Sequence, residues 1–178
     1  EYEEQERKRH EINRKHLAKG VRFIDLNAAY IDETVIIGEG TIVYPGVILE
    51  GSTVIGEDCI IGQNTRVVDS VIGNGTEVQS SVILESQVGN NTNIGPFAYL
   101  RPHSAIGNGV KVGDFVEVKN SSIGDGSKAS HLAYIGDSDV GEDVNIGCGV
   151  VFVNYDGKNK HRSVVKDSSF VGCNVNLV

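Results

Sequence analysis

Aliphatic residues recur every six positions along most of this chain. The first uninterrupted series comprises Ile31, Ile37, Val43, Leu49, Ile55, Ile61 and Val67. The series resumes with Val88, Ile94, Leu100, Ile106, Val112 and Val118 and continues, with some five-residue steps, through Ile123, Ala129, Ile135, Val140, Ile146 and Phe152. An amphipathic helix would repeat about every 3.6 residues and a half-buried strand about every 2. The period of six therefore predicts short strands separated by turns.

A second column of mostly small or β-branched residues lies four positions after the aliphatic residues. It comprises Val35, Thr41, Val47, Thr53, Cys59 and Thr65, then Thr92, Ala98, Ser104, Val110 and Val116. Glycine often follows the aliphatic residue directly, as at Gly38, Gly56 and Gly62. A single hexad cannot bury its apolar face alone, so hexads must stack, and this repeat is typical of a parallel β-helix. With three hexads in each coil, residues 31–178 would make about eight coils.

The first nineteen residues have a different character. They are densely charged and lack Gly and Pro, and they end at Gly20, a residue suited to closing a helix. This pattern predicts a linker helix over residues 1–20 and a β-helix domain over residues 21–178. Because charge runs usually face water, we expect the helix to be a solvated spacer that buries only Ile12, Leu17 and a few others.

The repeat is interrupted once, after Phe152. Residues 153–164 are mostly polar, and the period then resumes at Val165, Val171 and Leu177. A basic cluster stands in and beside this segment: Lys158, Lys160, Arg162 and Lys166. A polar insertion in a stacked repeat is a loop expelled at one corner, and such loops often mark the binding face. A tolerated surface loop is the alternative.

Composition restricts the class of protein. Aromatic residues make up only 6% of the chain, Trp and Met are absent and there are 22 glycines, so the core must be aliphatic with frequent tight turns. The net charge of −8 argues against nucleic-acid binding. No apolar stretch approaches the roughly 20 residues that span a bilayer. Three cysteines far apart fit free thiols in a reducing compartment. We therefore expect a cytoplasmic protein that binds neither nucleic acid nor membrane.

Two cations align in this repeat. Arg101 and Lys119 each directly follow an aliphatic residue of the series and lie 18 residues apart, which is one full coil. Their side chains should leave the same corner of neighbouring coils. Two cations at that distance repel each other unless an anion lies between them, and an Arg beside a Lys suits a phosphate group. Two solvated surface charges are the alternative.

His131, Cys148 and Cys173 occupy the same repeat position in three successive coils, if the insertion lies within one coil. A histidine on the outside of the coil is a candidate general base, because its pKa lies near working pH, although a structural histidine is the alternative. The cysteines could be nucleophiles, but we favour small residues that leave a groove open. A zinc site is not expected, because His103, His131 and His161 fall at three different repeat positions.

Four segments carry a family resemblance: FVEVK at 115–119, GSKASHLAYIGD at 126–137, VNIG at 144–147 and NYDGKNK at 154–160. Together they resemble the acetyltransferase domain of the bacterial bifunctional N-acetylglucosamine-1-phosphate uridyltransferase/glucosamine-1-phosphate acetyltransferase family. The resemblance runs from the charged N-terminal stretch, which is similar to that family's linker helix, to Val178. It implies an all-β, left-handed parallel β-helix that forms a homotrimer with active sites between subunits.

The resemblance also implies a reaction and its residues. Acetyl-CoA and glucosamine 1-phosphate would give N-acetylglucosamine 1-phosphate and CoA, a step toward UDP-N-acetylglucosamine and cell-wall precursors, with no metal needed. His131 matches the catalytic base of the family. The matching substrate-binding positions are Arg101, Lys119, Tyr134, Asn145 and Lys160, and those matching the acetyl-CoA side are Cys148, Asn154, Tyr155 and Cys173.

The chain departs from the family pattern in two ways. The nucleotidyltransferase half with its Gly-rich signature is absent, and the family continues through further coils, so we expect a domain that is incomplete at its C-terminal end and weakly active or inactive. The cysteines stand where the family typically has Ala and Ser. Two alternatives remain open: another hexapeptide acyltransferase, which a panel of acceptors would identify, and a non-catalytic β-helix scaffold, which would bind neither CoA nor a sugar phosphate.

Overall fold

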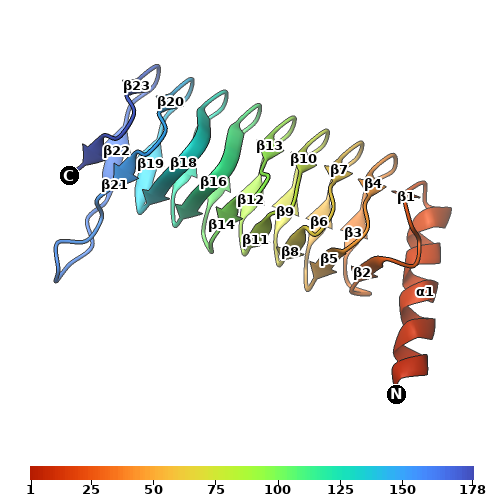
Figure 1. Ribbon diagram of the computed structural model, residues 1–178. Coiled ribbons are helices and arrows are strands. Elements are labelled where there is room, and N and C mark those ends of the chain that lie inside the picture. Colours follow the sequence, from red (N-terminus) through yellow and green to blue (C-terminus); the bar gives the residue numbers. More distant parts are fainter.

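The computed structural model, which describes residues 1–178, contains one helix and 24 strands that wind into a parallel β-helix (Figure 1). Every pairing between strands is parallel, and each strand pairs with the equivalent strand of the coils before and after it. The strands therefore form three ladders, one on each face of the β-helix. The predicted β-helix is confirmed, whereas its left-handed turn stays a prediction.

Each face of the β-helix is a stack of short strands from successive coils. Face one holds β1 (Arg22–Phe23), β4 (Ile42–Val43), β7 (Ile60–Ile61), β10 (Glu77–Val78), β13 (Asn93–Ile94), the first parts of β16 (Lys111–Lys119) and β18 (Lys128–Gly136), β20 (Asn145–Ile146) and β23 (Phe170–Val171). Face two holds β2 (Ala29–Ile31), β5 (Val47–Glu50), β8 (Arg66–Val68), β11 (Val82–Leu84), β14 (Tyr99–Leu100), the second parts of β16 and β18, β21 (Val151–Phe152) and β24 (Asn176–Leu177). Face three holds β3 (Ile36–Ile37), β6 (Val54–Ile55), β9 (Val71–Ile72), β12 (Gln87–Val88), β15 (Ala105–Ile106), β17 (Ser122–Ile123), β19 (Ser138–Val140) and β22 (Ser163–Val165).

The aliphatic series forms the core. Every member from Ile31 to Phe152 is buried, and Phe152 is the largest side chain with no exposed surface. The second column is buried as well, and Cys59 is among its members, as predicted. Because most of the two-residue strands contribute one inward side chain, the core is a continuous aliphatic stack rather than a cluster around aromatic residues.

The buried hydroxyls of the second column are all used. The Thr92 hydroxyl donates to the Gly107 carbonyl at 2.8 Å and accepts from the Val110 amide at 3.1 Å. Thr41 makes the same two kinds of bond, to Gly56 and from Cys59. A buried polar group is tolerated only when it is hydrogen-bonded, and these hydroxyls satisfy backbone groups at the corners between coils. Small hydroxylated residues are therefore suited to the inside of this β-helix.

Helix α1 (Tyr2–Ala18) is not the free spacer that the charge pattern predicts, because it lies across the open end of the first coils (Figure 1). Asn13, which is fully buried, donates to the carbonyls of Leu26 and Ala29 at 2.8 and 3.0 Å. Leu17, expected to be buried, is 49% exposed. The first coil has no coil before it, so its exposed edge needs a cap, and a polar residue meets that need better than an apolar one.

The insertion is confirmed as a loop that leaves the β-helix between β21 and β22 (Figure 1). Successive coils elsewhere differ by about 17 residues in register, as between Lys128 and Asn145, whereas the step across the insertion, from Asn145 to Phe170, is 25 residues. Pairing resumes on all three faces after the loop. The loop therefore adds residues without disturbing the stack.

The structure contains no helix that combines the length and the apolar character needed to cross a bilayer.

Candidate active site

His131 lies at the corner between faces one and two, in the middle of β18. The strands β16 and β18 are longer than the others because they continue around this corner, and their register places Asp114 directly opposite His131. The Nδ1 atom of His131 lies 2.8 Å from an Oδ1 oxygen of Asp114. The imidazole is 61% exposed, so a substrate can reach it.

This His–Asp pair orients a proton acceptor. A carboxylate accepts a proton-bearing Nδ1, which leaves the Nε2 lone pair directed away from Asp114 and free to take a proton. The hydrogen bond from His131 is the main reason that the pKa of Asp114 lies below its usual value. Sequence reasoning missed Asp114, although it stands one coil before His131 and a search for carboxylates at that offset would have found it.

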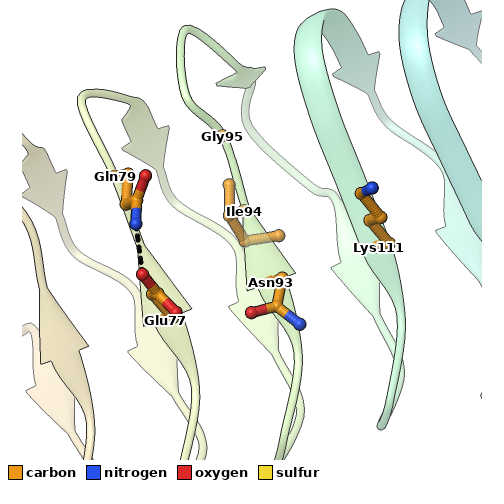
Figure 2. A pocket seen from close by; sticks show the side chains of 6 residues that line it. All are labelled: Glu77, Gln79, Asn93, Ile94, Gly95 and Lys111. Carbon is orange, nitrogen blue, oxygen red and sulfur yellow. Dashed lines mark hydrogen bonds between the residues drawn. The ribbon is translucent and has the colours of Figure 1, made fainter.

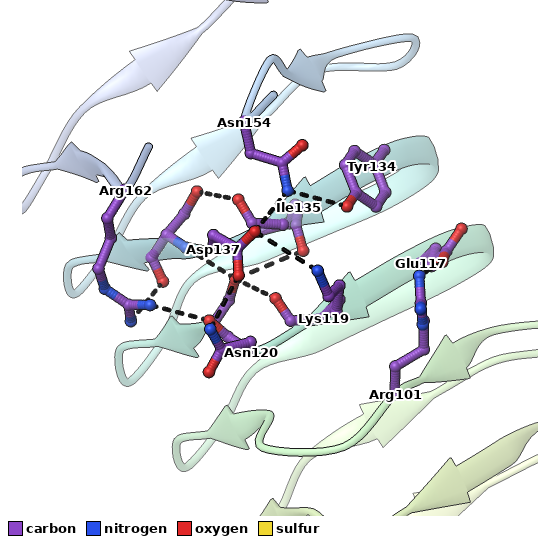
Figure 3. Close-up of polar contacts among 12 residues, drawn as sticks. Arg101, Glu117, Lys119, Asn120, Tyr134, Ile135, Asp137, Asn154 and Arg162 are labelled. Atoms are coloured by element: carbon purple, nitrogen blue, oxygen red, sulfur yellow. Dashed lines mark hydrogen bonds and ion pairs between the residues drawn. The ribbon is translucent and has the colours of Figure 1, made fainter. Parts of the chain in front are cut away.

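Arg101 and Lys119 leave the same edge of face two, as their spacing predicts. The register pairs Leu100 with Val118, and the residues that follow them are the two cations. Each cation has a carboxylate neighbour: Arg101 Nη1 lies 2.9 Å from Glu117, and Lys119 Nζ lies 3.5 Å from Asp137 (Figure 3). Sequence reasoning missed both carboxylates.

Lys160 reaches these two cations from the insertion loop. The neighbouring amino group of Lys119, and to a smaller extent the charge of Arg101, lowers the pKa of Lys160. We call Arg101, Lys119 and Lys160 the cation cluster. Cations brought together against their own repulsion form a binding site for an anion, because a bound anion removes the repulsion.

Asp137 is the polar centre behind the cation cluster (Figure 3). Its carboxylate accepts from Asn120 at 2.8 Å and from the buried Asn154 at 2.7 Å. Burial opposes ionisation of Asp137, but these hydrogen bonds and the charge of Lys119 outweigh it and lower its pKa. The charged carboxylate in turn lies 3.5 Å from the Lys119 amino group and stabilises its charge.

Tyr134 joins this network through Asn154, whose amide donates to the Tyr134 hydroxyl at 3.1 Å. Gly136 makes room for both groups. A Cβ atom at Gly136 would lie 2.3 Å from the Tyr134 hydroxyl and 2.8 Å from the Asn154 amide nitrogen. No side chain fits there without displacing them, so Gly136 belongs to the construction of the site.

A shallow hollow of about 370 Å³ connects the corner with face two. Its lining is mostly apolar and includes Phe115, Leu132, Tyr134 and Val151. Tyr134 lines the hollow directly, whereas His131 and Asp114 are not among its lining residues. A second groove, lined by Glu77, Gln79, Asn93, Ile94, Gly95 and Lys111 (Figure 2), holds none of the predicted site residues.

The residues predicted for the acetyl-CoA side fall in two places. Cys148 and Cys173 align with His131 at the corner, because the register carries Ala129 onto Ile146 and Ile146 onto Val171. Asn154 and Tyr155 lie instead on the face-two side, where the insertion loop begins. Within one chain the structure does not bring these two pairs together.

Asn145 is also separated from the other predicted substrate residues. It is exposed on face one, opposite Lys128 and Phe170 in the ladder, whereas the cation cluster and Tyr134 lie toward face two.

No group of three or more His, Cys, Asp or Glu side chains is placed to hold a metal ion.

The cysteines should differ sharply in reactivity. Cys148 and Cys173 are exposed, whereas Cys59 is buried and burial raises its pKa. A thiol reacts as the thiolate, so two thiols should react rapidly with a chromogenic aromatic disulfide and the third only after unfolding in guanidinium. Replacing Cys59 with Ala should remove only the slow thiol, and three fast thiols in the native protein would contradict the buried position.

Comparison with known proteins identifies a matching repeat family and similar sequences. The bacterial transferase hexapeptide family (six repeats) matches residues 34–69 and 85–120. The chain is 62% identical over 170 residues to the bifunctional protein GlmU of Clostridioides difficile (strain 630), and 69% identical over 170 residues to that of Alkaliphilus oremlandii (strain OhILAs). Each alignment covers 96% of this chain and 37% of the relative, so the chain spans little more than a third of these proteins.

A solved structure supports the fold. The UDP-N-acetylglucosamine acyltransferase from Campylobacter jejuni matches with a TM-score of 0.59 and 14% identity, over 85% of this chain and 66% of that chain. The similarity to the C-terminal region of the bifunctional relatives confirms the resemblance predicted from the four sequence segments.

Proposed function

We propose that this chain, a hexapeptide-repeat β-helix similar to the C-terminal region of bifunctional GlmU proteins, transfers the acetyl group of acetyl-CoA to the amine of glucosamine 1-phosphate. The observation that carries the proposal is that the same coils carry both groups: His131 faces Asp114 at one end of the face-two ladder of β16 and β18, and Arg101 and Lys119 stand at the other end. The pair supplies a proton acceptor for an amine, and the cluster supplies a site for the phosphate of the same substrate.

The reaction follows from the chemistry of these groups. The sugar amine attacks the carbonyl carbon of the thioester, and the nitrogen gives up a proton to Nε2 of His131 as the carbon–nitrogen bond forms. The carbon–sulfur bond then breaks, and CoA leaves as a thiol once it has received a proton. The carboxylate of Asp114 stabilises the imidazolium in between. An acceptor fixed at its phosphate end presents its amine at a constant position, which supplies further rate.

The phosphate end of the acceptor is assigned to Arg101, Lys119 and Lys160, with Tyr134 beside the sugar. Asn145, Asn154, Tyr155, Cys148 and Cys173 would complete the site between subunits. This arrangement explains why one chain separates Asn145 from Tyr134. The assay that tests the whole proposal is the release of CoA from acetyl-CoA with glucosamine 1-phosphate as acceptor, with glucosamine and a nucleotide-linked sugar for comparison. No release with any acceptor would contradict it.

Replacing Lys119 with Ala should raise the KM for glucosamine 1-phosphate far more than the KM for acetyl-CoA. The amine of Lys119 is a charge-assisted donor toward the phosphate, and such contacts are worth about 1.5–3 kcal/mol. Steady-state kinetics with each substrate varied in turn will show the difference. Lys8→Ala, an exposed lysine of helix α1, is the matched control, and equal rises in both KM values for Lys119→Ala would contradict the assignment.

The homotrimer is part of the proposal and has its own support at the corner. Other coils turn this corner through residues suited to positive φ, such as Gly46 and Asn64, but three successive coils use Phe97, Phe115 and Leu132, with φ of 58°, 58° and 36°. These side chains are 60%, 59% and 56% exposed, and the two phenylalanine rings stack at 5.8 Å. A bulky apolar residue gains nothing from a strained, exposed position in an isolated chain. A second copy covering this column would account for it.

Replacing Phe115 with Asn should weaken the oligomer without unfolding the chain. Asn tolerates positive φ, so the substitution relieves backbone strain while it removes the apolar surface. Analytical ultracentrifugation should show the wild type as a trimer and the variant shifted toward monomer at the same concentration. Val71→Thr, on face three, should leave the oligomer intact, and an unchanged trimer in Phe115→Asn would count against this column as the interface.

A further inference from the structure

Lys160 is the member of the cation cluster that has no carboxylate partner. Arg101 pairs with Glu117 and Lys119 with Asp137, each within 4.0 Å, whereas no ion pair reaches Lys160. The excess positive charge of the cluster therefore comes from Lys160, and a phosphate would gain most from this residue. Lys160 is also the only cation of the three that comes from a loop.

The position of Lys160 is electrostatically unfavourable. Lys119 and Arg101 both repel Lys160, which is why its pKa is lowered. Inside the loop, Asp156 closes a turn by accepting from the backbone amides of Lys158 and Asn159, and Tyr155 bridges to Lys160. These contacts shape the loop, but they do not attach it to the coils. Some other contact must hold Lys160 against the repulsion.

Arg162 provides that attachment. Its guanidinium makes a two-bonded pair with Asp139 of β19, Nε to Oδ2 at 2.7 Å and Nη2 to Oδ1 at 2.5 Å. It also donates to the carbonyl of Asn120 at 2.9 Å and to that of Ser138 at 3.3 Å. These partners come from two earlier coils, so one side chain ties the end of the loop to both (Figure 3).

The partner of Arg162 is itself fixed. The Ser122 hydroxyl donates to Asp139 at 2.8 Å, and the hydrogen bonds from Arg162 and Ser122 lower the pKa of Asp139 to about 2. Flanking backbone bonds continue the attachment, from the His161 amide to the Asn154 carbonyl at 2.8 Å and from the Ser163 amide to the Asp137 carbonyl at 3.1 Å. Lys160 stands only two residues before Arg162, and two residues span at most about 7 Å. Fixing Arg162 on the coil therefore limits how far Lys160 can move away from it.

We propose that Arg162 is a positioning residue, which holds Lys160 in the cation cluster through its bond to Asp139 and thereby sets the affinity of this surface for phosphate groups. The identity of the phosphate-bearing acceptor rests on the proposed function, but the affinity for phosphate does not. Lysine at this position would keep the charge but could not reproduce the two-bonded geometry.

The test measures phosphate binding directly. Isothermal titration with inorganic phosphate should show binding about tenfold weaker for Arg162→Lys and for Asp139→Asn than for the wild type. In a Lys160→Ala background, which itself lowers affinity, Arg162→Lys should have no further effect, because the residue it positions is gone. Arg66→Lys is the matched control, since Arg66 pairs with Glu50 at 2.6 Å on face two, away from the cluster. Thermal unfolding of each variant shows whether the chain is folded.

Kinetics supply a second readout. Arg162→Lys should raise the KM for glucosamine 1-phosphate about tenfold and leave kcat and the KM for acetyl-CoA within about twofold. Wild-type phosphate affinity in Arg162→Lys, or an equal loss with and without Lys160, would overturn the proposal. If the wild type transfers no acetyl group but the phosphate titrations behave as stated, the proposed function fails and the role of Arg162 stands.

Discussion

Replacing His131 with Ala will lower kcat for acetyl transfer about 10²–10⁴-fold, because the attacking amine loses its proton acceptor. The KM values for both substrates should change little, since the cation cluster that holds the phosphate is untouched. Asp114→Asn should cause a smaller loss, about 10- to 100-fold, because the amide can still contact Nδ1 but no longer balances the imidazolium charge. The rate of CoA release, followed with a chromogenic disulfide, measures both effects.

A second exposed His–Asp pair, His161 with Asp156, provides the control. His161 is 63% exposed and its Nε2 lies 2.7 Å from Asp156, so it resembles His131 in exposure and partner but stands on the insertion loop. His161→Ala should leave kcat within about twofold. A similar kcat in wild type and His131→Ala would remove His131 from the chemistry, whereas an equal loss in both histidine variants would indicate a general effect on folding.

Replacing Phe152 with Ala will destabilise the protein by about 3–5 kcal/mol, the usual cost of emptying a phenylalanine site in a packed core. Phe152 has no exposed surface and is the largest side chain buried in this way. It belongs to β21, from whose end the insertion loop departs. Urea unfolding of the two proteins measures the difference in the free energy of unfolding.

Phe170→Ala is the matched control, because Phe170 is 75% exposed and its loss should change the free energy of unfolding by no more than about 0.5 kcal/mol. Since each coil contacts only its neighbours, the damage in Phe152→Ala should be local. Hydrogen exchange should accelerate in the C-terminal coils and remain unchanged near Leu49. Uniform acceleration along the chain would show that the coils unfold together.

The fold was predictable from the sequence because the same six-residue pattern of an inward aliphatic side chain recurs along most of the chain. A single aliphatic residue such as Leu100 says little about its surroundings, but the whole series fixes which residues share a column. The alignment of Arg101 with Lys119 and of His131 with Cys148 followed from counting residues, and the register bears it out. The position of the insertion loop followed from the interruption of that count.

Contacts that depend on side-chain direction could not be counted in this way. The docking of α1 was missed because Asn13 reads as one more polar residue in a charged run, and only the uncapped edge of the first coil gives it partners. The attachment of Arg162 to Asp139 spans 23 residues and an insertion, so no constant offset reveals it. Asn145, which the resemblance implies in the substrate site, lies on face one, and no offset within one chain joins it to Tyr134.

Because pairing resumes on all three faces beyond the insertion, the loop can change in length without moving the residues on the coils. The ladder from β16 to β18 sets the distances among His131, Asp114 and Lys119, while the loop of residues 153–162 sets how far Lys160 reaches. A longer or shorter loop would therefore change the reach of Lys160 and leave the His131 corner as it is.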